Sequence, residues 1–326
     1  MLLQVRNFTW RDGDRTIRFG RGSVATAGEL VGSGYLLLTT PRARSAAPEL
    51  IERAGTVLDV PPGLVDQISA ALLAQVQSTR GVSTSLVALG GGRVIDTAKA
   101  LGAATGRAVA AIPTTLSAAE MTWLHRAVAG LDPVPAPVRP RVVINDPVLS
   151  ASQPLEELAA SAANSLGHAV EAPITAHATP VPTLAAQEAA RLTAAAYEDE
   201  ANPDREALAL AALLSGYAID SAWYGLHHVL SQTLVRVGGI GHGQANSGLL
   251  PHTMRALAER GHGLVADVAL AERLAALAGT THLAALGVDD ATLDACADAA
   301  AQRPDLANTP PVPSRDELRA IYAAAL

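Results

Sequence analysis

Cysteine and aromatic residues are scarce in this chain of 326 residues, which has 1 Cys, 3 Trp, 5 Tyr and 2 Phe. The single cysteine, Cys296, excludes an internal disulfide framework and a thiolate-rich metal site. The shortage of aromatic rings argues against a stacking platform for single-stranded nucleic acid. Basic residues are in the minority, with 24 Lys and Arg against 31 Asp and Glu and a net charge of −7. A nucleic-acid partner would require a basic surface, so we expect none.

Long apolar runs are absent as well. No uninterrupted apolar stretch is long enough to span a bilayer. The N-terminal segment Met1–Arg15 carries charges too early for the apolar region of a secretory signal. Hydrophobic residues nevertheless make up 49% of the chain and charged residues 17%, which is enough to bury a large core. These features predict a cytoplasmic protein without a membrane segment.

The first half of the chain alternates short β-rich runs with helical stretches. Helical periodicity covers Pro62–Ser78 and Arg93–Thr105, and strands are predicted at Thr16–Phe19, Tyr35–Thr39, Thr56–Val60, Ser85–Leu89, Ala108–Ile112 and Arg141–Ile144. Such alternation indicates βαβ units and a mostly parallel, Rossmann-like sheet. The proline-rich segment Leu131–Pro140 is predicted to be a surface loop.

The pattern changes after Asp146-Pro147. From about Ser152 onward strand signals are lacking, and Ala- and Leu-rich helical periodicity continues to the end of the chain. We therefore predict an α/β N-terminal domain over residues 1–150 and an all-α C-terminal domain over residues 151–326.

Three consecutive glycines follow one predicted strand. Gly90, Gly91 and Gly92 end the run Leu86–Leu89 and open the helix that contains Lys99, the only lysine of the chain. Glycines let backbone N–H groups approach a ligand, and the start of a helix attracts anions such as a pyrophosphate. The spacing matches neither the usual Rossmann nor the Walker fingerprint. A simple strand-to-helix turn therefore remains the alternative to an anion site.

Hydroxyl side chains follow two other predicted strands. Thr114, Thr115 and Ser117 come after Ala108–Ile112, and Thr39 ends an earlier strand. Ligands of open α/β sheets bind at the carboxyl ends of the parallel strands. Each of these residues alone is more often an ordinary cap or turn residue. Together they predict a shared ligand crevice.

Histidines in the helical half form a second candidate site. Asn164 and His168 are four residues apart, as are His228 and Gln232, so each pair shares a helix face. His227 points about 100° away from His228. Convergence of His168, His228 and His242 would suit a divalent metal or acid–base chemistry. The remaining candidates are interpreted as structural: His125, His177, His262 and His282.

Together these motifs resemble the group III, iron-containing alcohol dehydrogenase family of the dehydroquinate synthase-like fold. The family segment Gly-Gly-Gly-Ser-x-x-Asp-x-x-Lys is matched by Gly90–Lys99, with Arg93 in place of Ser, and its Ile-Pro-Thr-Thr segment by Ile112–Thr115. Its Asp-x-x-x-His helix and two further histidines fall on Asn164, His168, His228 and His242. The similarity is greatest to the maleylacetate reductase branch, at Thr39-Thr40-Pro41, Pro113–Ser117 and Gly225–His228.

This resemblance implies a homodimer that reduces the C=C bond of maleylacetate, or of a related unsaturated keto-diacid, with NADH or NADPH; in the family the product is 3-oxoadipate. It implies a pyrophosphate site at Gly90, Gly91, Gly92 and Arg93, with Asp96 organising the turn, and ribose or nicotinamide contacts from Thr39, Thr114, Thr115 and Ser117. Catalytic roles are implied for His168, His228, His242, Asn164 and Gln232, in a cleft between the domains. Arg236 is a candidate partner for a substrate carboxylate, and Arg42 and Arg44 for an adenosine 2′-phosphate.

Departures from the family pattern keep two alternatives open. Asn164 stands where the metal-dependent members have Asp, and a neutral amide is a weaker ligand for a hard cation, so we expect no metal. The first alternative is an Fe- or Zn-dependent alcohol or aldehyde dehydrogenase with His168, His228 and His242 as ligands. The second is a member without redox activity, a lyase, a cyclase or a ligand-binding protein. It is suggested by Ala118-Ala119 in place of Gly-Ser and by the missing lysine after this loop.

Overall fold

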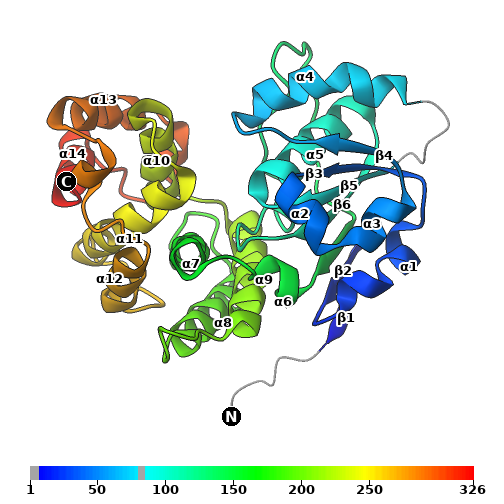
Figure 1. The fold of residues 1–326 in the computed structure, drawn as a ribbon. Coiled ribbons are helices and arrows are strands. Elements are labelled where there is room, and N and C mark those ends of the chain that lie inside the picture. The colour runs from blue at the N-terminus through cyan, green and yellow to red at the C-terminus, as the bar shows by residue number, and fades with distance from the viewer. Residues whose placement is uncertain (1–6, 80–84) are drawn as a thin grey trace. The chain divides into compact units, whose positions relative to one another are not determined.

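The computed structural model describes residues 7–79 and 85–326. The chain divides into two compact units, Met1–Ser152 and Gln153–Leu326, so the division lies close to the change in sequence pattern near residue 150. The start of the N-terminal segment that argues against a secretory signal, residues 1–6, lies outside the described residues. Figure 1 shows the first unit in blue to green and the helices of the second in green to red.

The first unit is built on a seven-stranded sheet in the order β1-β2-β7-β6-β5-β3-β4. Every neighbouring pair is parallel except β1 and β2, which form an antiparallel hairpin at the edge. The strands are β1 (Phe8–Asp12), β2 (Arg15–Phe19), β3 (Tyr35–Thr39), β4 (Ala54–Asp59), β5 (Ser85–Gly90), β6 (Ala108–Pro113) and β7 (Val142–Asn145). The predicted mostly parallel sheet is therefore confirmed.

Two apolar layers cover the faces of this sheet. Alternate residues of β3 and β5 point to opposite faces, so that Leu36 and Leu86 belong to one buried cluster and Leu37 and Val87 to the other. On the first face pack α4 (Val65–Ser78) and α5 (Gly92–Thr105), and on the second α2 (Pro41–Ala46) and α3 (Pro48–Arg53). Burial on both faces explains why the central strands are continuous apolar runs.

Short elements complete the first unit. They are η1 (Ser23–Thr26), α1 (Gly28–Val31) and α6 (Pro147–Ser150). The segment Leu131–Pro140 contains no helix or strand, as predicted. His125 lies in the preceding loop, where its Nδ1 donates to the carbonyl of Arg126 at 2.9 Å and its Nε2 accepts from the N–H of Val138 at 3.1 Å. Both ring nitrogens are used, which confirms the structural interpretation of this histidine.

The second unit consists of helices and turns, with no strand among its residues, all of which are described. Its elements are α7 (Leu155–Glu171), α8 (Pro180–Ala196), α9 (Arg205–Ala222), α10 (Leu226–Thr233), η2 (Leu234–Gly238), α11 (His242–Glu259), α12 (Val268–Leu277), η3 (Leu283–Leu286), α13 (Asp290–Ala301), η4 (Pro304–Asn308) and α14 (Arg315–Ala324). Among the described helices none has the length and apolarity needed to cross a bilayer.

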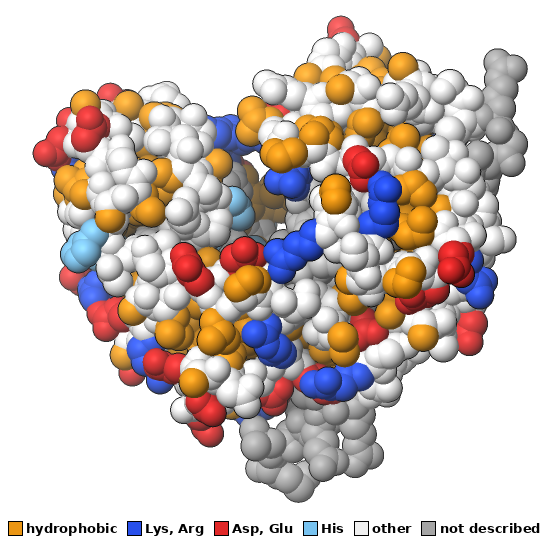
Figure 2. Space-filling model, viewed as in Figure 1, with side chains coloured by type: hydrophobic (Ala, Val, Ile, Leu, Met, Phe, Trp, Pro, Cys, Tyr) orange, Lys and Arg blue, Asp and Glu red, His pale blue; other side chains and the backbone are white. Residues whose placement is uncertain are grey.

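Helix α7 lies at the centre of the second unit and packs against α8, α9, α11 and α12. Almost every residue from Leu158 to Glu171 is buried, so this helix carries its polar side chains into the interior. On the outside, acidic and basic side chains are interspersed over the face shown in Figure 2. The buried polar residues of α7 are therefore candidates for a functional role.

Candidate active site

Buried imidazoles from α7 and α10 form the centre of the candidate site. His168 of α7 stacks on His228 of α10, with ring centroids 4.6 Å apart and planes inclined by 14°. His227 meets His228 edge-on at 5.0 Å. All three side chains are buried, and Asn164 is buried one turn before His168. The structure thus brings together two of the predicted histidines and adds His227.

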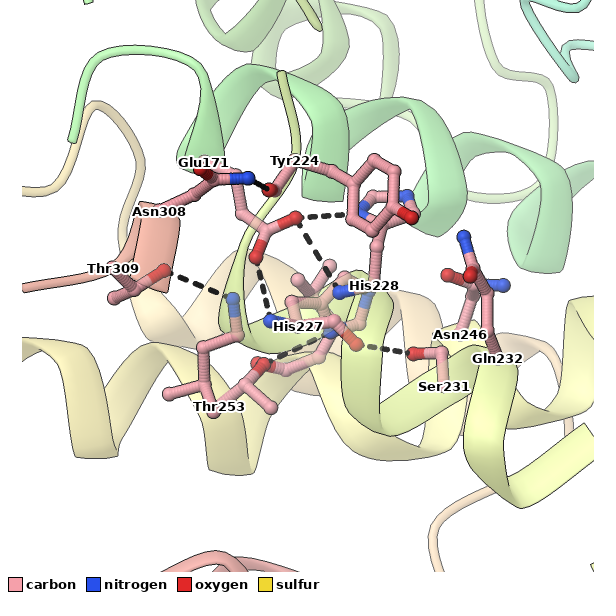
Figure 3. Close-up of polar contacts among 12 residues, drawn as sticks. Glu171, Tyr224, His227, His228, Ser231, Gln232, Asn246, Thr253, Asn308 and Thr309 are labelled. Atoms are coloured by element: carbon pink, nitrogen blue, oxygen red, sulfur yellow. Dashed lines mark hydrogen bonds and ion pairs between the residues drawn. The ribbon is translucent and has the colours of Figure 1, made fainter. Parts of the chain in front are cut away.

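Glu171 organises this cluster (Figure 3). One carboxylate oxygen, Oε2, lies 2.5 Å from Nδ1 of His228, and the other, Oε1, accepts the backbone N–H of His227 at 2.5 Å. The backbone N–H groups of His228 and Gly225 also donate to this carboxylate. A fully buried carboxylate with four donors is well compensated, and it fixes the start of α10 relative to the end of α7.

These hydrogen bonds determine the tautomers of both α10 histidines. Because Nδ1 of His228 donates to Glu171, Nε2 carries the lone pair of the neutral ring, and it is buried without a partner among the described residues. The hydroxyl of Thr253 donates to backbone carbonyls of α11, so it accepts from Nδ1 of His227 at 3.0 Å. In each ring Nε2 is therefore the nitrogen that carries the lone pair.

Burial makes the cluster neutral at physiological pH. Desolvation, followed by the charge of His228, lowers the pKa of His227 to about 3, and desolvation followed by His242 lowers the pKa of His228 to about 3. The pKa of His168 is lowered well below its usual value for the same reasons. Burial raises the pKa of Glu171, while His227 and the surrounding backbone N–H groups act in the opposite direction. An additional anion placed beside these rings would favour their protonated forms.

His242 is placed differently from the prediction. It is exposed and forms the first residue of α11, where Nδ2 of Asn246 donates to its Nε2 at 3.2 Å and to its carbonyl oxygen at 2.8 Å. Because that carbonyl can only accept, the amide atom at this position must be nitrogen, and it occupies the lone pair of Nε2. His242 nevertheless lies close enough to His168 and His228 for its charge to lower the pKa of both.

The possible metal ligands of the candidate site are the buried histidines and Asn164. Within residues 7–79 and 85–326, no group of three or more His, Cys, Asp or Glu side chains is placed to hold an ion. Asn164 contributes a neutral oxygen, Oδ1, which is buried and has no partner among those residues. Divalent iron or zinc would need at least three converging donors, and a hydrogen bond from Asn246 occupies Nε2 of His242 in this structure.

Arg303 is a contact residue that the sequence analysis does not identify. It follows α13 and donates from Nη2 to Oε1 of Gln232 and to the hydroxyl of Tyr224, both at 3.1 Å. The ring of Tyr224 lies 6.2 Å from that of His228. Arg236, predicted as a carboxylate partner, is exposed on η2.

In the first unit the turn formed by Gly90, Gly91 and Gly92 packs against the loop that follows β6 and carries Thr115 and Ser117. A Cβ at Gly91 would lie 3.0 Å from the side chain of Thr115, and one at Gly92 3.1 Å from Ser117. Larger residues would push the two segments apart, so close packing is one reason for the glycines. No side chain caps the start of α5, and Arg93 is exposed in its first turn. Because no side chain caps them, the first backbone N–H groups of α5 can donate to an anion.

The other predicted nucleotide residues differ in accessibility. Thr114, Thr115 and Ser117 are half-buried along the loop, whereas Thr39 is fully buried at the end of β3 with its hydroxyl 3.4 Å from the carbonyl of Thr40. Thr39 therefore exposes no surface to a ligand in this structure. Ala118 has a positive φ of 60°, a conformation that favours glycine.

Lys99 of α5 binds the loop that follows β6 through its buried ammonium group. Its buried ammonium donates to the carbonyls of Ala119, Thr122 and Leu124 at 3.0, 3.1 and 2.8 Å. It also pairs with Asp96 at 2.7 Å. Asp96 is thus paired with Lys99, three residues further along α5; that it also organises the glycine turn, as the resemblance implies, stays a prediction. The pair connects the helix that starts at the glycines to the loop that follows β6.

Glu171 and Arg303, which were not predicted, differ in whether the sequence carries a signal for them. Glu171 lies three residues after His168 in the same helix, a spacing that places both on one face and could have indicated it. Arg303 lies 71 residues after Gln232, and no local spacing connects them.

Comparisons with known families and proteins agree with the architecture. The "Iron-containing alcohol dehydrogenase" family profile matches residues 14–147, and the "Fe-containing alcohol dehydrogenase family, C-terminal" profile matches residues 158–278. Maleylacetate reductase 1 of Rhodococcus opacus is 30% identical over 308 residues, covering 88% of this chain and 84% of that protein.

Solved structures show the same similarity. Maleylacetate reductase from Agrobacterium tumefaciens superposes with a TM-score of 0.79 at 26% identity, covering 98% of both chains. A 1,3-propanediol oxidoreductase superposes with a TM-score of 0.80, also at 26% identity, covering 98% of this chain and 99% of that one. Both likenesses extend over the two units.

Proposed function

The chain belongs to the iron-containing alcohol dehydrogenase family of oxidoreductases and is similar to its maleylacetate reductases, and we propose that it reduces maleylacetate or a related unsaturated keto-diacid with NADH or NADPH. The observation that carries this proposal is the bond from His228 Nδ1 to Glu171, which leaves Nε2 of a buried, neutral imidazole unpaired. Such a nitrogen can receive and return a proton without a metal.

The first unit would bind the nucleotide. The uncapped start of α5 at Gly91 and Gly92 suits the pyrophosphate, and the half-buried hydroxyls of Thr114, Thr115 and Ser117 border it. When bound, NADH or NADPH supplies the hydride. Arg44, a candidate for binding the adenosine 2′-phosphate of NADPH, is already paired with Asp59 at 2.5 Å. Its presence therefore does not decide between NADH and NADPH, and both are compared in the first binding experiment.

His228 would supply the proton. A substrate carboxylate beside the cluster raises the pKa of the nearby imidazole, because an opposite charge favours the protonated ring. Glu171 stabilises that imidazolium through Nδ1, which orients the N–H of Nε2 toward the reacting group. His168, stacked on His228, limits the positions that this ring can adopt.

The direct test is turnover of maleylacetate by the purified protein, followed by the absorbance of NADH or NADPH. We expect His228→Ala to lower kcat by roughly 10²- to 10⁴-fold. His177→Ala, at an exposed position of the same unit, should leave kcat unchanged. No turnover by the wild-type protein would refute the proposed substrate, and full activity of His228→Ala would refute the proton donor.

A metal-dependent alcohol oxidoreductase is the second candidate. It is favoured by the likeness to 1,3-propanediol oxidoreductase and by the unpartnered buried atoms His168 Nδ1 and Asn164 Oδ1. In that case Asn164 and His168, one turn apart on α7, would hold the ion together with histidines of other helices. About one iron or zinc per chain, together with loss of alcohol oxidation on chelation, would favour this candidate over the first.

A further inference from the structure

Gln232 occupies a defined place beside the proton-donating histidine. It lies on α10 four residues after His228, so both side chains share one helix face. His228 is buried, whereas Gln232 is half-buried and retains accessible surface. Figure 3 shows both residues with Tyr224 at the same end of the cluster.

Arg303 fixes the orientation of the Gln232 amide. Nη2 of Arg303 lies 3.1 Å from Oε1 of Gln232. A guanidinium can only donate hydrogen bonds, so the amide atom that faces it must be the oxygen. The amide nitrogen, with its two hydrogens, is therefore directed away from Arg303 and remains available as a donor.

Arg303 is itself held by the tail of the chain. Its guanidinium pairs with Asp305 at 2.9 Å, and the indole N–H of Trp223 donates to the same carboxylate at 3.2 Å. Trp223 has a positive φ of 64°, an uncommon backbone conformation that such contacts must maintain. The amide of Gln232 is thus attached to a rigid frame rather than to a mobile surface arginine.

The same guanidinium keeps an unused donor. Nη1 of Arg303 is buried and has no hydrogen-bond partner among the described residues. Nη2 also donates to the hydroxyl of Tyr224, whose ring borders His228. An unpaired buried donor next to an oriented amide makes this group of residues suited to an oxygen-bearing ligand.

We propose that Gln232 is the hydrogen-bond donor that recognises a substrate carboxylate beside His228, and that Arg303 is the positioning residue that keeps this donor available. This inference rests on the proposed function and adds the group that selects a carboxylate-bearing substrate. A neutral amide donates at every pH at which the protein is folded, so recognition does not depend on a second cation in the site.

Gln232→Glu tests the donor without removing the frame. The new carboxylate still accepts from Arg303, but it has no hydrogens to offer and repels an anion. We expect the KM for maleylacetate to rise about 10- to 100-fold with kcat within about threefold and NADH affinity unchanged. Gln187→Glu, which adds the same charge at an exposed position on α8, should change none of these values.

A double-mutant cycle tests the positioning role. Arg303→Met should raise KM about 5- to 10-fold, because the amide can then rotate. In a Gln232→Ala background the same change at Arg303 should have no further effect on KM. Equal effects of Arg303→Met in both backgrounds would overturn the positioning role, and an unchanged KM for Gln232→Glu would overturn the donor role.

A binding measurement keeps the inference independent of turnover. In ¹⁵N-labelled protein the side-chain NH₂ signals of Gln232 are identified by their absence in Gln232→Glu. Addition of adipate, a six-carbon dicarboxylate, should move these signals and spare those of Gln187. If the wild-type protein does not reduce maleylacetate but adipate moves the Gln232 signals, the proposed function fails and the carboxylate site stands. If adipate moves neither signal, the site is refuted.

Discussion

Glu120 offers a quantitative test of how burial destabilises a carboxylate beneath the loop that follows β6. This side chain is fully buried, with Nδ2 of Asn145 at 3.5 Å from Oε1 and no partner for Oε2 among the described residues. Burial raises its pKa from 4.5 to about 7, against the opposing effects of its own backbone N–H and of Lys99 and Arg15. Substitution by Gln keeps the shape and removes the ionisation.

The size and sign of the effect follow from that shift. A change from 4.5 to about 7 corresponds to about 3 kcal/mol. Below pH 4.5 both the folded and the unfolded states carry the proton on Glu120, so burial of this side chain costs no ionisation energy and the wild-type protein has its full stability. As the pH rises from 4.5 to about 7 the unfolded state loses the proton first, and the stability of the wild-type protein falls. Glu120→Gln should therefore be the more stable protein at pH 8, by up to about 3 kcal/mol.

The measurement must report on the first unit alone. Urea titrations are made between pH 5 and pH 8. Hydrogen exchange of peptides from β5 and β6 monitors unfolding at each urea concentration and gives the free energy of unfolding of the first unit. Glu52→Gln, at an exposed position of α3, is the matched control and should keep the pH dependence of the wild type. Parallel pH profiles for wild type and Glu120→Gln would refute the reasoning, as would a variant that is less stable at pH 8.

Three further substitutions test other parts of the network. Glu171→Gln cannot accept every bond that the carboxylate receives, and steady-state kinetics should show kcat reduced by about 10- to 100-fold. Lys99→Met leaves buried carbonyls and Asp96 without their cation, so calorimetry should show weaker NADH binding and urea titration a loss of about 3 kcal/mol. Ala118→Gly relieves the strain of a positive φ and should raise the free energy of unfolding by about 1 kcal/mol. The control Ala119→Gly should lower it by about 0.5–1 kcal/mol. A reversed order of the two variants would contradict the strain argument.

The central strands could be predicted because their environment is uniform. Tyr35–Thr39 is buried at every position, so a continuous apolar run was sufficient to identify it. Phe8–Asp12 was missed because it is a half-exposed edge strand with charged residues. The short helices α1, α2, α3 and α6 have four to six residues, too few for helical periodicity to appear in the sequence.

The candidate site could be predicted only within single helices. Spacing places Asn164 with His168 on α7, but it does not show which residues of another helix meet them. His242 illustrates the limit, because its distance from His228 along the chain does not show how closely the two side chains approach each other or that Asn246 holds the ring of His242. Contacts between helices depend on packing angles and on residues such as Arg303, whose partners are remote in sequence.

Lys99 shows how composition and geometry combine. It is the only lysine among 24 basic residues, which the sequence alone cannot explain. The structure gives a physical reason, since its ammonium lies within 3.1 Å of three backbone carbonyls and 2.7 Å from Asp96. A tetrahedral ammonium can direct its hydrogens to acceptors on several sides, whereas a guanidinium donates only in its plane and needs more room. A buried cage of this kind therefore selects lysine in a chain that otherwise uses arginine, and Lys99→Arg should destabilise the loop although the charge is kept.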